Sequence, residues 1–430
     1  MKTTLAILVF IGVLAECSTA QVLQGRLVTS AYGWQRQDTV GSSSNHLYGY
    51  QTVQLSLTKG DYSVSTYLQG WNDFAGPLKN EGKLRLYNLY FKWRNIADLG
   101  ELTLGRQAVF AGVGVGTIDG INATARLLQN KVKIVGYAGP LAPADLGAQP
   151  TDNLWDNAMY GGQVVFAPLE YGQVSVSYMK RNLQPQSYMA TRYDPNTGPY
   201  LMEIRPSASN EEYLSGDVSG QYDFFYGYLR YDHDLLMEKM SRFQFFTRVK
   251  PIDRVGVTVE YVQREPRVSY NSIFSAFTFN SLKDIELGLE YEVPYIPDLQ
   301  VFGKYGEVNY GDEKSTQLTG GAAWKYVSAN ASIISGYNGK INAASLNAGY
   351  PLFENMITPT VNFSYGRYKL SQYDLHRTVA WSGALGVVYR PVPVFSVDTQ
   401  VQWIQNKIYK NDVRLFFRAS YLLNERLTLF

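Results

Sequence analysis

The amino-acid sequence predicts an all-β fold: a transmembrane, antiparallel, up-and-down β-barrel of about 22 strands, with roughly 18–22 as the range. Three observations lead to this prediction. Side chains alternate between apolar and polar along most of the 430 residues, which is the period of a β-strand. Beyond residue 20, no apolar run reaches the about 18 residues of a membrane-spanning helix. Aromatic residues make up 14% of the chain and charged residues only 18%, below the about 25% of an average soluble domain.

The first 20 residues have the pattern of a secretory signal peptide. Lys2 precedes an apolar run, Leu5–Ala15, and small residues follow at 18–20. The run is too short to cross a bilayer, which takes about 20 residues. We therefore expect cleavage after Ala20, export from a bacterial cytoplasm, and a single barrel domain over residues 21–430.

The composition excludes several classes of function. The chain has 39 Lys and Arg residues against 37 Asp and Glu residues, and this balance argues against a nucleic-acid partner. Cys17, the single cysteine, lies within the expected signal peptide, which leaves no disulfide or thiolate metal site. The three histidines, at 46, 233 and 376, lack the spacing of metal ligands. No nucleophile elbow, phosphate loop or zinc motif occurs, so we expect no cofactor, no metal, no catalytic residue and no enzymatic activity.

The alternation defines individual strands. In the segment 254–264, Val255, Val257 and Val259 share one face and Glu260 lies on the other. The same pattern predicts strands at 25–34, 46–58, 61–71, 84–94, 99–107, 119–128, 130–139, 157–166, 173–181, 210–221, 224–232, 240–249, 254–264, 284–292, 299–309, 315–326, 329–337, 341–350, 357–370, 376–390, 394–405 and 413–421.

The connections between these strands alternate in length. Short turns are expected at 59–60, 129–130, 250–253, 293–298 and 390–393, and longer polar connections at 35–45, 72–83, 140–156, 182–209 and 266–281. Short turns on one side and long loops on the other are typical of outer-membrane barrels. An even number of strands places both termini on the short-turn side, which is the periplasm.

A soluble β-sandwich would also alternate, with its apolar face turned inward. Two features favour lipid instead. The polar faces carry many charged residues, as a wet lumen requires, and aromatic residues recur near strand ends, as in the interface girdles of membrane barrels. An alternative interpretation of the aromatic residues is that they are simply good strand formers. The proposed girdle residues are Trp34, Trp71, Trp93, Trp324, Trp381 and Trp403.

One segment resembles a known family. The stretch Gly100–Gln107 (GELTLGRQ), followed by Gly112–Gly120 (GVGVGTIDG), is similar to a pattern in bacterial outer-membrane porins of the alginate-export and OprD-like groups. The resemblance covers about 55 residues. It implies that this connection folds into the lumen and narrows it; an ordinary surface loop is the alternative. The candidate constriction residues are Arg106, Gln107, Gly112, Gly114, Gly116 and Asp119.

Arg106 is a special case because it lies on the same side of its predicted strand as Leu102 and Leu104, and its side chain would therefore point to lipid. We therefore expect the ladder to break before Arg106, so that its side chain turns into the pore or anchors the loop.

Strand parity also places charged side chains in the lumen. A strand rich in acids opposite an arginine wall would sort polar solutes by charge. The alternative is that these charges pair with one another and only keep the wall rigid and hydrated. The candidate lumen charges are Arg126, Arg242, Arg248, Glu286, Glu290, Arg414 and Arg418.

These features together predict a passive channel of the bacterial outer membrane for small hydrophilic solutes, such as sugars or organic anions. The expected partners are these solutes or ions, the lipid, and the barrel-assembly machinery, which would recognise the terminal aromatic residue Phe430. The first predicted strand begins about five residues after the cleavage site, so we expect no plug domain. The alternative function is a non-conducting barrel that acts as a structural scaffold, an adhesin or a shell for a partner protein.

Overall fold

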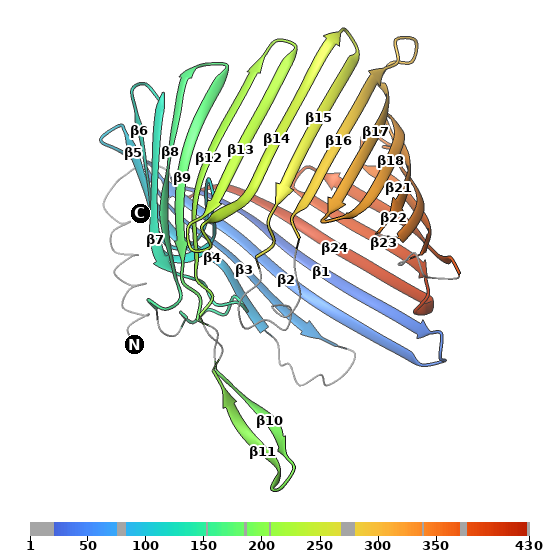
Figure 1. Ribbon diagram of the computed structural model, residues 1–430, viewed down its shortest axis with the longest axis horizontal. Coiled ribbons are helices and arrows are strands. Elements are labelled where there is room, and N and C mark those ends of the chain that lie inside the picture. The colour runs from blue at the N-terminus through green and yellow to red at the C-terminus, as the bar shows by residue number, and fades with distance from the viewer. Residues whose placement is uncertain are drawn as a thin grey trace.

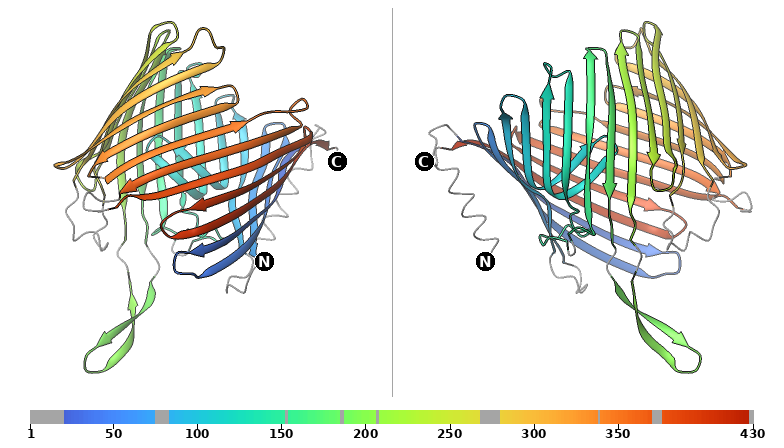
Figure 2. Two further views of the ribbon diagram at one scale, coloured as in Figure 1. Left: turned by 90° about the vertical axis from the view of Figure 1, so that its right-hand side faces the viewer. Right: turned by 60° about the vertical axis from the view of Figure 1, so that its left-hand side comes forward.

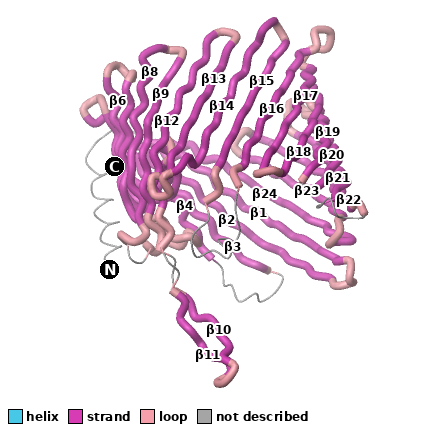
Figure 3. Tube along the Cα trace, viewed as in Figure 1, coloured by secondary structure: helices cyan, strands magenta, loops and turns pink. Residues whose placement is uncertain are grey.

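A computed structural model describes residues 21–74, 83–151, 154–184, 187–205, 208–267, 280–337, 339–369 and 376–427. The expected signal peptide and Phe430 lie outside these residues. Strands joined by turns and loops make up the described chain (Figure 3). No helix within these ranges is long and apolar enough to span a membrane. The strands are β1 (Gln21–Asp38), β2 (Ser43–Lys59), β3 (Tyr62–Asp73), β4 (Lys83–Ile96), β5 (Gly100–Ala111), β6 (Gly114–Leu127), β7 (Val132–Pro140), β8 (Ala158–Leu169), β9 (Gly172–Arg181), β10 (Tyr188–Asp194), β11 (Gly198–Ile204), β12 (Glu211–Tyr222), β13 (Phe225–Asp234), β14 (Lys239–Ile252), β15 (Val255–Arg264), β16 (Leu282–Glu292), β17 (Leu299–Tyr310), β18 (Glu313–Trp324), β19 (Val327–Gly336), β20 (Gly339–Gly349), β21 (Ile357–Lys369), β22 (Thr378–Val392), β23 (Phe395–Gln405) and β24 (Tyr409–Leu427).

All of these strands except β10 and β11 form one antiparallel sheet of 22 strands, and the pairing of β1 with β24 closes it into a barrel (Figures 1 and 2). Gln21 pairs with Leu427, so the first and last described residues lie at the same end of the barrel. The predicted fold class and strand number are confirmed. Closure matters physically because it leaves no unpaired edge along the wall.

Most of the barrel strands are longer than a membrane requires. They range from the 9 residues of β7 to the 19 residues of β24. A tilted transmembrane strand needs only about 9–11 residues. The longest strands therefore extend past the thickness of a bilayer.

The small sheet of β10 and β11 was not predicted, because residues 182–209 were expected to be a loop. These strands pair from Tyr188↔Ile204 to Asp194↔Gly198 and project away from the end of the barrel (Figures 1 and 2). The turn between them, Asp-Pro-Asn-Thr-Gly at 194–198, is a hairpin signal in the sequence.

On the side of the barrel where long loops were predicted, several connections are shorter than expected. Residues 39–42 alone join β1 to β2, where the sequence suggested a loop over 35–45. Their hydrogen bonds explain the short loop, since Asp38 Oδ1 accepts from the backbone N–H groups of Val40 and Ser42. An Asp side chain that accepts these backbone hydrogen bonds stabilises a tight turn, so a short connection is sufficient here.

The two faces of the wall differ in chemistry. One face carries exposed apolar side chains, such as Leu289 on β16, Leu385 on β22 and Trp403 on β23. The other carries the ion pairs and lines the lumen. Trp93, Trp324, Trp381 and Trp403 share the parity of the apolar face, as predicted for a girdle.

Two of the six girdle predictions were wrong. Trp34 pairs in register with Arg414, and Trp71 pairs with Tyr50, so both lie on the lumen face. The sequence misled here because proximity to a strand end was weighed above strand parity.

Candidate functional site

The hairpin of β5 and β6 leaves the barrel wall part of the way along its length. The pairing of β5 with β4 ends at Leu89↔Arg106, and the pairing of β6 with β7 ends at Ile121↔Ala138. The two strands remain paired with each other to Ala111↔Gly114. Gly105, at φ +116°, supplies the backbone conformation for the departure, which L side chains rarely adopt.

The released part of the hairpin lies across the lumen face of strands that are not its neighbours in the sheet. Val109, Ala111 and Ile118 are fully buried against a cluster on β7, β8 and β9. Burying one Val or Ile side chain stabilises a structure by about 1.5–3 kcal/mol. The wall side of this cluster consists of Val135, Tyr137, Met159 and Met179.

Glycines at the tip allow this close approach. Gly112, at φ +60°, lies so near Ser177 that a Cβ atom there would overlap its hydroxyl, and a Cβ on Gly114 would overlap the hydroxyl of Tyr137. The backbone N–H of Val113 donates a 2.9 Å hydrogen bond to Ser177 Oγ. Gly116 faces Met159. The Gly-rich motif therefore permits contact between backbone and wall.

The opposite side of the hairpin is apolar and open. Phe110 and Val115 pair in register, and Phe110 is 79% exposed. Because the hairpin lies on the inner wall, these two side chains project toward the lumen.

Arg106 sits where the hairpin departs, and its side chain is only 4% exposed. Its Nε and Nη2 atoms donate hydrogen bonds of 2.6 and 2.7 Å to the two carboxylate oxygens of Asp119. Its Nη1 atom donates to the carbonyls of Leu86, at 3.2 Å, and Gly147, at 2.6 Å. The alternation does place Arg106 on the lipid side, but the segment 141–151 covers it there. Of the two outcomes expected, Arg106 anchors a loop and does not turn into the pore.

The segment 141–151 fills the gap that the departing hairpin leaves between β4 and β7. The N–H of Leu86 donates to the carbonyl of Leu146 at 2.8 Å, and the N–H of Ala142 donates to Thr117 at 2.9 Å. Backbone groups that lost their neighbouring strand are thus satisfied. In the sequence, only the length of the connection points to this arrangement.

Gln107 stabilises the same junction from the other side. Its Nε2 atom donates hydrogen bonds of 3.1 Å to the carbonyls of Thr103 and Gly120. This fully enclosed amide joins β5 to β6 at the point where both leave the wall.

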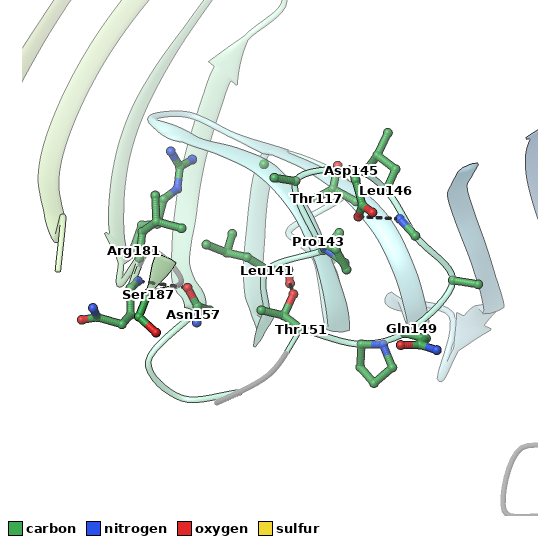
Figure 4. A pocket seen from close by; sticks show the side chains of 18 of the residues that line it. Thr117, Leu141, Pro143, Asp145, Leu146, Gln149, Thr151, Asn157, Arg181 and Ser187 are labelled. Carbon is green, nitrogen blue, oxygen red and sulfur yellow. Dashed lines mark hydrogen bonds between the residues drawn. The ribbon is translucent and has the colours of Figure 1, made fainter. Parts of the chain in front are cut away.

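A cavity of about 1830 Å³ lies between the hairpin, the segment 141–151 and a third group of residues (Figure 4). This group consists of Leu183, Gln184, Ser187, Glu203 and Arg205. Arg181 borders it and donates to Glu211 at 3.0 Å and to the carbonyl of Val115. On another side, Thr151 donates to the carbonyl of Leu141 at 2.6 Å. The cavity is therefore lined by apolar and polar groups together, with Leu84, Leu141 and Leu146 beside Arg181 and Thr151.

Six of the seven candidate lumen charges form ion pairs. Arg126 lies 3.8 Å from Glu101, Arg248 lies 2.5 Å from Glu290, and Glu286 lies 2.7 Å from Lys304. The acids of β16 thus pair with cations on strands close to them in the sheet, and not with a distant arginine wall.

The remaining pairs lie on β23 and β24. Arg414 and Arg36 both bind the buried carboxylate of Asp412, at 2.7 and 3.2 Å, and Arg418 pairs with Asp398. Arg242, the seventh candidate, donates a hydrogen bond to Gln244. These pairs correspond to the alternative stated for the sequence, in which wall charges neutralise one another.

No group of three or more His, Cys, Asp or Glu residues within the described ranges could hold a metal ion.

Comparison with known proteins gives only distant likenesses. No protein-family model matches the chain, and no curated protein matches it. Among solved structures, the translocation pore of the P pilus usher PapC has a TM-score of 0.46 at 9% identity, covering 92% of this chain and 99% of that one. OpdQ of Pseudomonas aeruginosa has a TM-score of 0.44 at 11% identity, covering 94% and 98%. OccK2 (OpdF) of the same organism has a TM-score of 0.43 at 9% identity, also covering 94% and 98%.

Proposed function

We propose that this chain forms a passive channel for small hydrophilic solutes in a bacterial outer membrane. The observation that carries the proposal is a closed barrel of 22 strands whose exposed apolar side chains share one face while the ion pairs share the other. In hydrocarbon, every backbone polar group of a sheet has to be paired, and only a closed barrel achieves this.

The energetics of the two faces support this orientation. A one-residue slip of β24 would turn Arg414 and Arg418 toward lipid, at a cost of about 2–4 kcal/mol for each arginine near the midplane. The same slip would bring Leu415 and Phe417 into the aqueous lumen. Register, and with it the wet interior, is therefore fixed by the membrane.

The lumen suits polar solutes that cross without chemical change. Its ion pairs hydrate the wall, while the hairpin tip at 111–114 reaches β9 and occupies part of the cross-section. We propose that this hairpin sets the size limit of the channel, with Phe110 at its inner edge.

The cellular context completes the proposal. Residues 1–20 would be removed on export, residues 21–430 would form the single barrel domain, and both termini would lie in the periplasm. The assembly machinery would insert the barrel through its C-terminal strand.

Reconstitution in planar bilayers tests the function. Purified protein that migrates as a folded, heat-modifiable barrel should give open steps of constant size. If protein folded by that criterion remains silent over a range of salt concentrations and voltages, the channel function is wrong.

One observation favours a second function. The hairpin of β10 and β11 projects beyond the barrel and exposes Tyr193, Leu201 and Met202. A silent barrel that carries such a hairpin would fit the adhesion or partner-binding scaffold considered from the sequence.

A further inference from the structure

The strands β24, β1, β2 and β3 lie side by side in the barrel (Figure 1). Together they carry a row of rings on their lumen face. We call this row the aromatic track. Register places its members on one face, because Tyr32 lies opposite both Phe416 and Tyr48, and Trp71 lies opposite Tyr50. The aromatic track consists of Phe416, Tyr32, Trp34, His46, Tyr48, Tyr50 and Trp71.

The rings form a continuous series of contacts. The ring centroids of Phe416 and Tyr32 are 4.7 Å apart, those of Tyr32 and Tyr48 are 6.4 Å apart, and those of Tyr48 and His46 are 5.7 Å apart. Trp34 extends the series at 4.5 Å from His46. Trp71 extends it sideways at 6.2 Å from Tyr48. Tyr48 is thus the centre of the track.

These rings do not form a closed core. All seven are half-buried, so each keeps part of its surface open to the lumen. By contrast, the rings and aliphatic side chains beneath the β5–β6 hairpin are buried by the hairpin itself. Cross-strand aromatic pairs do stabilise a sheet, but isolated pairs would serve that purpose. A continuous open series provides an extended contact surface.

Most of the charges beside the track are compensated, whereas Arg85 of β4, whose guanidinium carbon lies 6.0 Å from the ring centroid of Trp71, adds a further cation. Arg36 lies over the ring of Trp34, with its guanidinium carbon 4.0 Å from the ring centroid, and binds Asp412. Arg414 shares the same carboxylate, and His46 contacts Asp73 at 3.1 Å. Arg36, Arg414 and His46 therefore each face a carboxylate and have little charge left for a free anion. Donors and acceptors lie side by side with apolar rings, which is the combination that a ring bearing hydroxyl groups would use.

We propose that the aromatic track binds pyranose rings of saccharides as they pass along the lumen. The C–H groups of a pyranose carry partial positive charge, which suits the negative face of an aromatic ring. The hydroxyl groups of the sugar would exchange hydrogen bonds with the tyrosine hydroxyls and with the Arg36–Asp412–Arg414 group. This inference rests on the proposed channel function for its biological meaning, but not for the binding itself.

The binding test uses purified, detergent-solubilised protein without a membrane. Isothermal titration with maltopentaose and with cellopentaose covers α- and β-linked glucose rings. We expect saturable binding of at least one, and at least a tenfold weaker affinity for Tyr48→Ala. The matched control is Phe246→Ala, which removes one ring of an isolated lumen-facing pair, Tyr226 and Phe246, at 5.9 Å. It should bind as the unaltered protein does.

Linear and charged solutes separate the alternatives. Sorbitol has the hydroxyl groups but no ring, and benzoate has a ring and a negative charge. If neither pentaose binds, if sorbitol competes equally, or if benzoate alone binds, the saccharide proposal is wrong. An unchanged affinity in a folded Tyr48→Ala variant, or an equal loss in Phe246→Ala, would remove the track as the site.

Planar-bilayer recordings distinguish this proposal from the channel function. In a conducting protein, the binding pentaose should block open channels transiently, and Tyr48→Ala should shorten each block at least tenfold while conductance changes little. A silent protein that still binds the pentaose would refute the channel and support the track. A conducting protein that binds neither pentaose would support the channel function and refute saccharide binding by the track.

Discussion

Arg106 and Asp119 join the two strands of the β5–β6 hairpin by a bidentate ion pair, at the point where the hairpin leaves the barrel wall. The same guanidinium binds the carbonyl of Gly147, so one side chain fastens the hairpin and the segment that fills the gap behind it. A planar fork of five donors is suited to this double task, and a lysine could not reproduce it.

Replacing Arg106 with Met should destabilise the folded barrel. The change leaves the Asp119 carboxylate without its partner and removes the guanidinium donor from the carbonyls of Leu86, Gly147 and Gln149. Breaking a buried ion pair in this way typically costs about 3–5 kcal/mol. The measurement is the temperature at which the barrel unfolds in heat-modifiability gels, which should fall. Arg205→Met, at an arginine that is 79% exposed, is the control and should leave this temperature unchanged. Equal temperatures for both variants would contradict the anchoring role.

Shortening the hairpin should increase conductance. Replacing residues 108–117 with Asn-Gly leaves Gln107 opposite Ile118, joined by a two-residue turn that suits a hairpin. The lumen then loses the hairpin tip, so single-channel conductance should rise. Trimming the β10–β11 hairpin by the same number of residues is the control, because it lies outside the barrel. If conductance does not change in the first variant, the hairpin does not limit the pore.

Removing either partner of the Arg418–Asp398 ion pair should change the ion preference of the channel. Arg418→Gln leaves Asp398 unpaired and should shift the reversal potential in a salt gradient toward cations. Asp398→Asn leaves Arg418 unpaired and should shift it toward anions. Shifts in the same direction, or none in either variant, would mean that this pair does not face the ion path.

A side chain at Gly114 should disrupt packing of the hairpin on the wall. Gly114→Val places methyl groups where the hydroxyl of Tyr137 lies, and overpacking of this kind costs about 1–3 kcal/mol. Gly136→Val is the matched control on β7, because nothing lies within 4 Å of a Cβ atom there. Only the first variant should unfold at a lower temperature. If both variants unfold at the same temperature, the close approach at Gly114 does not contribute to the stability of the barrel.

The turn of the β10–β11 hairpin should loosen in acid. The backbone N–H groups of Asn196 and Thr197 donate to Asp194 at 2.7 and 3.1 Å and hold the pKa of that carboxyl below its ordinary value. Because the folded pKa is lowered, the stabilisation is complete above the unfolded pKa of about 3.9 and is lost as the pH falls through the folded pKa. Protection of these two amides from hydrogen exchange should drop in that range. Asp194→Asn should lack this dependence, and protection that is independent of pH in the unaltered chain would refute the prediction.

The sequence determined the wall of this protein. Alternation such as that of Val255, Val257 and Val259 against Glu260 predicted the strands of the barrel and which face is apolar, because side chains of a strand point to its two sides in turn. The even count and the closed form followed, since a sheet of this kind leaves no other way to satisfy its edges. Parity also assigned the seven candidate charges to one face of the wall, opposite the apolar side chains.

The arrangement inside the wall depends on contacts between segments that meet only in the folded barrel. Arg106 has the parity of a lipid-facing residue, and only the return of the segment 141–151 encloses it. Pairing between distant strands, such as Tyr32 with Phe416, depends on how the barrel closes. Local periodicity predicts that the barrel closes but not the register in which β1 pairs with β24, because the paired residues are separated by almost the whole chain.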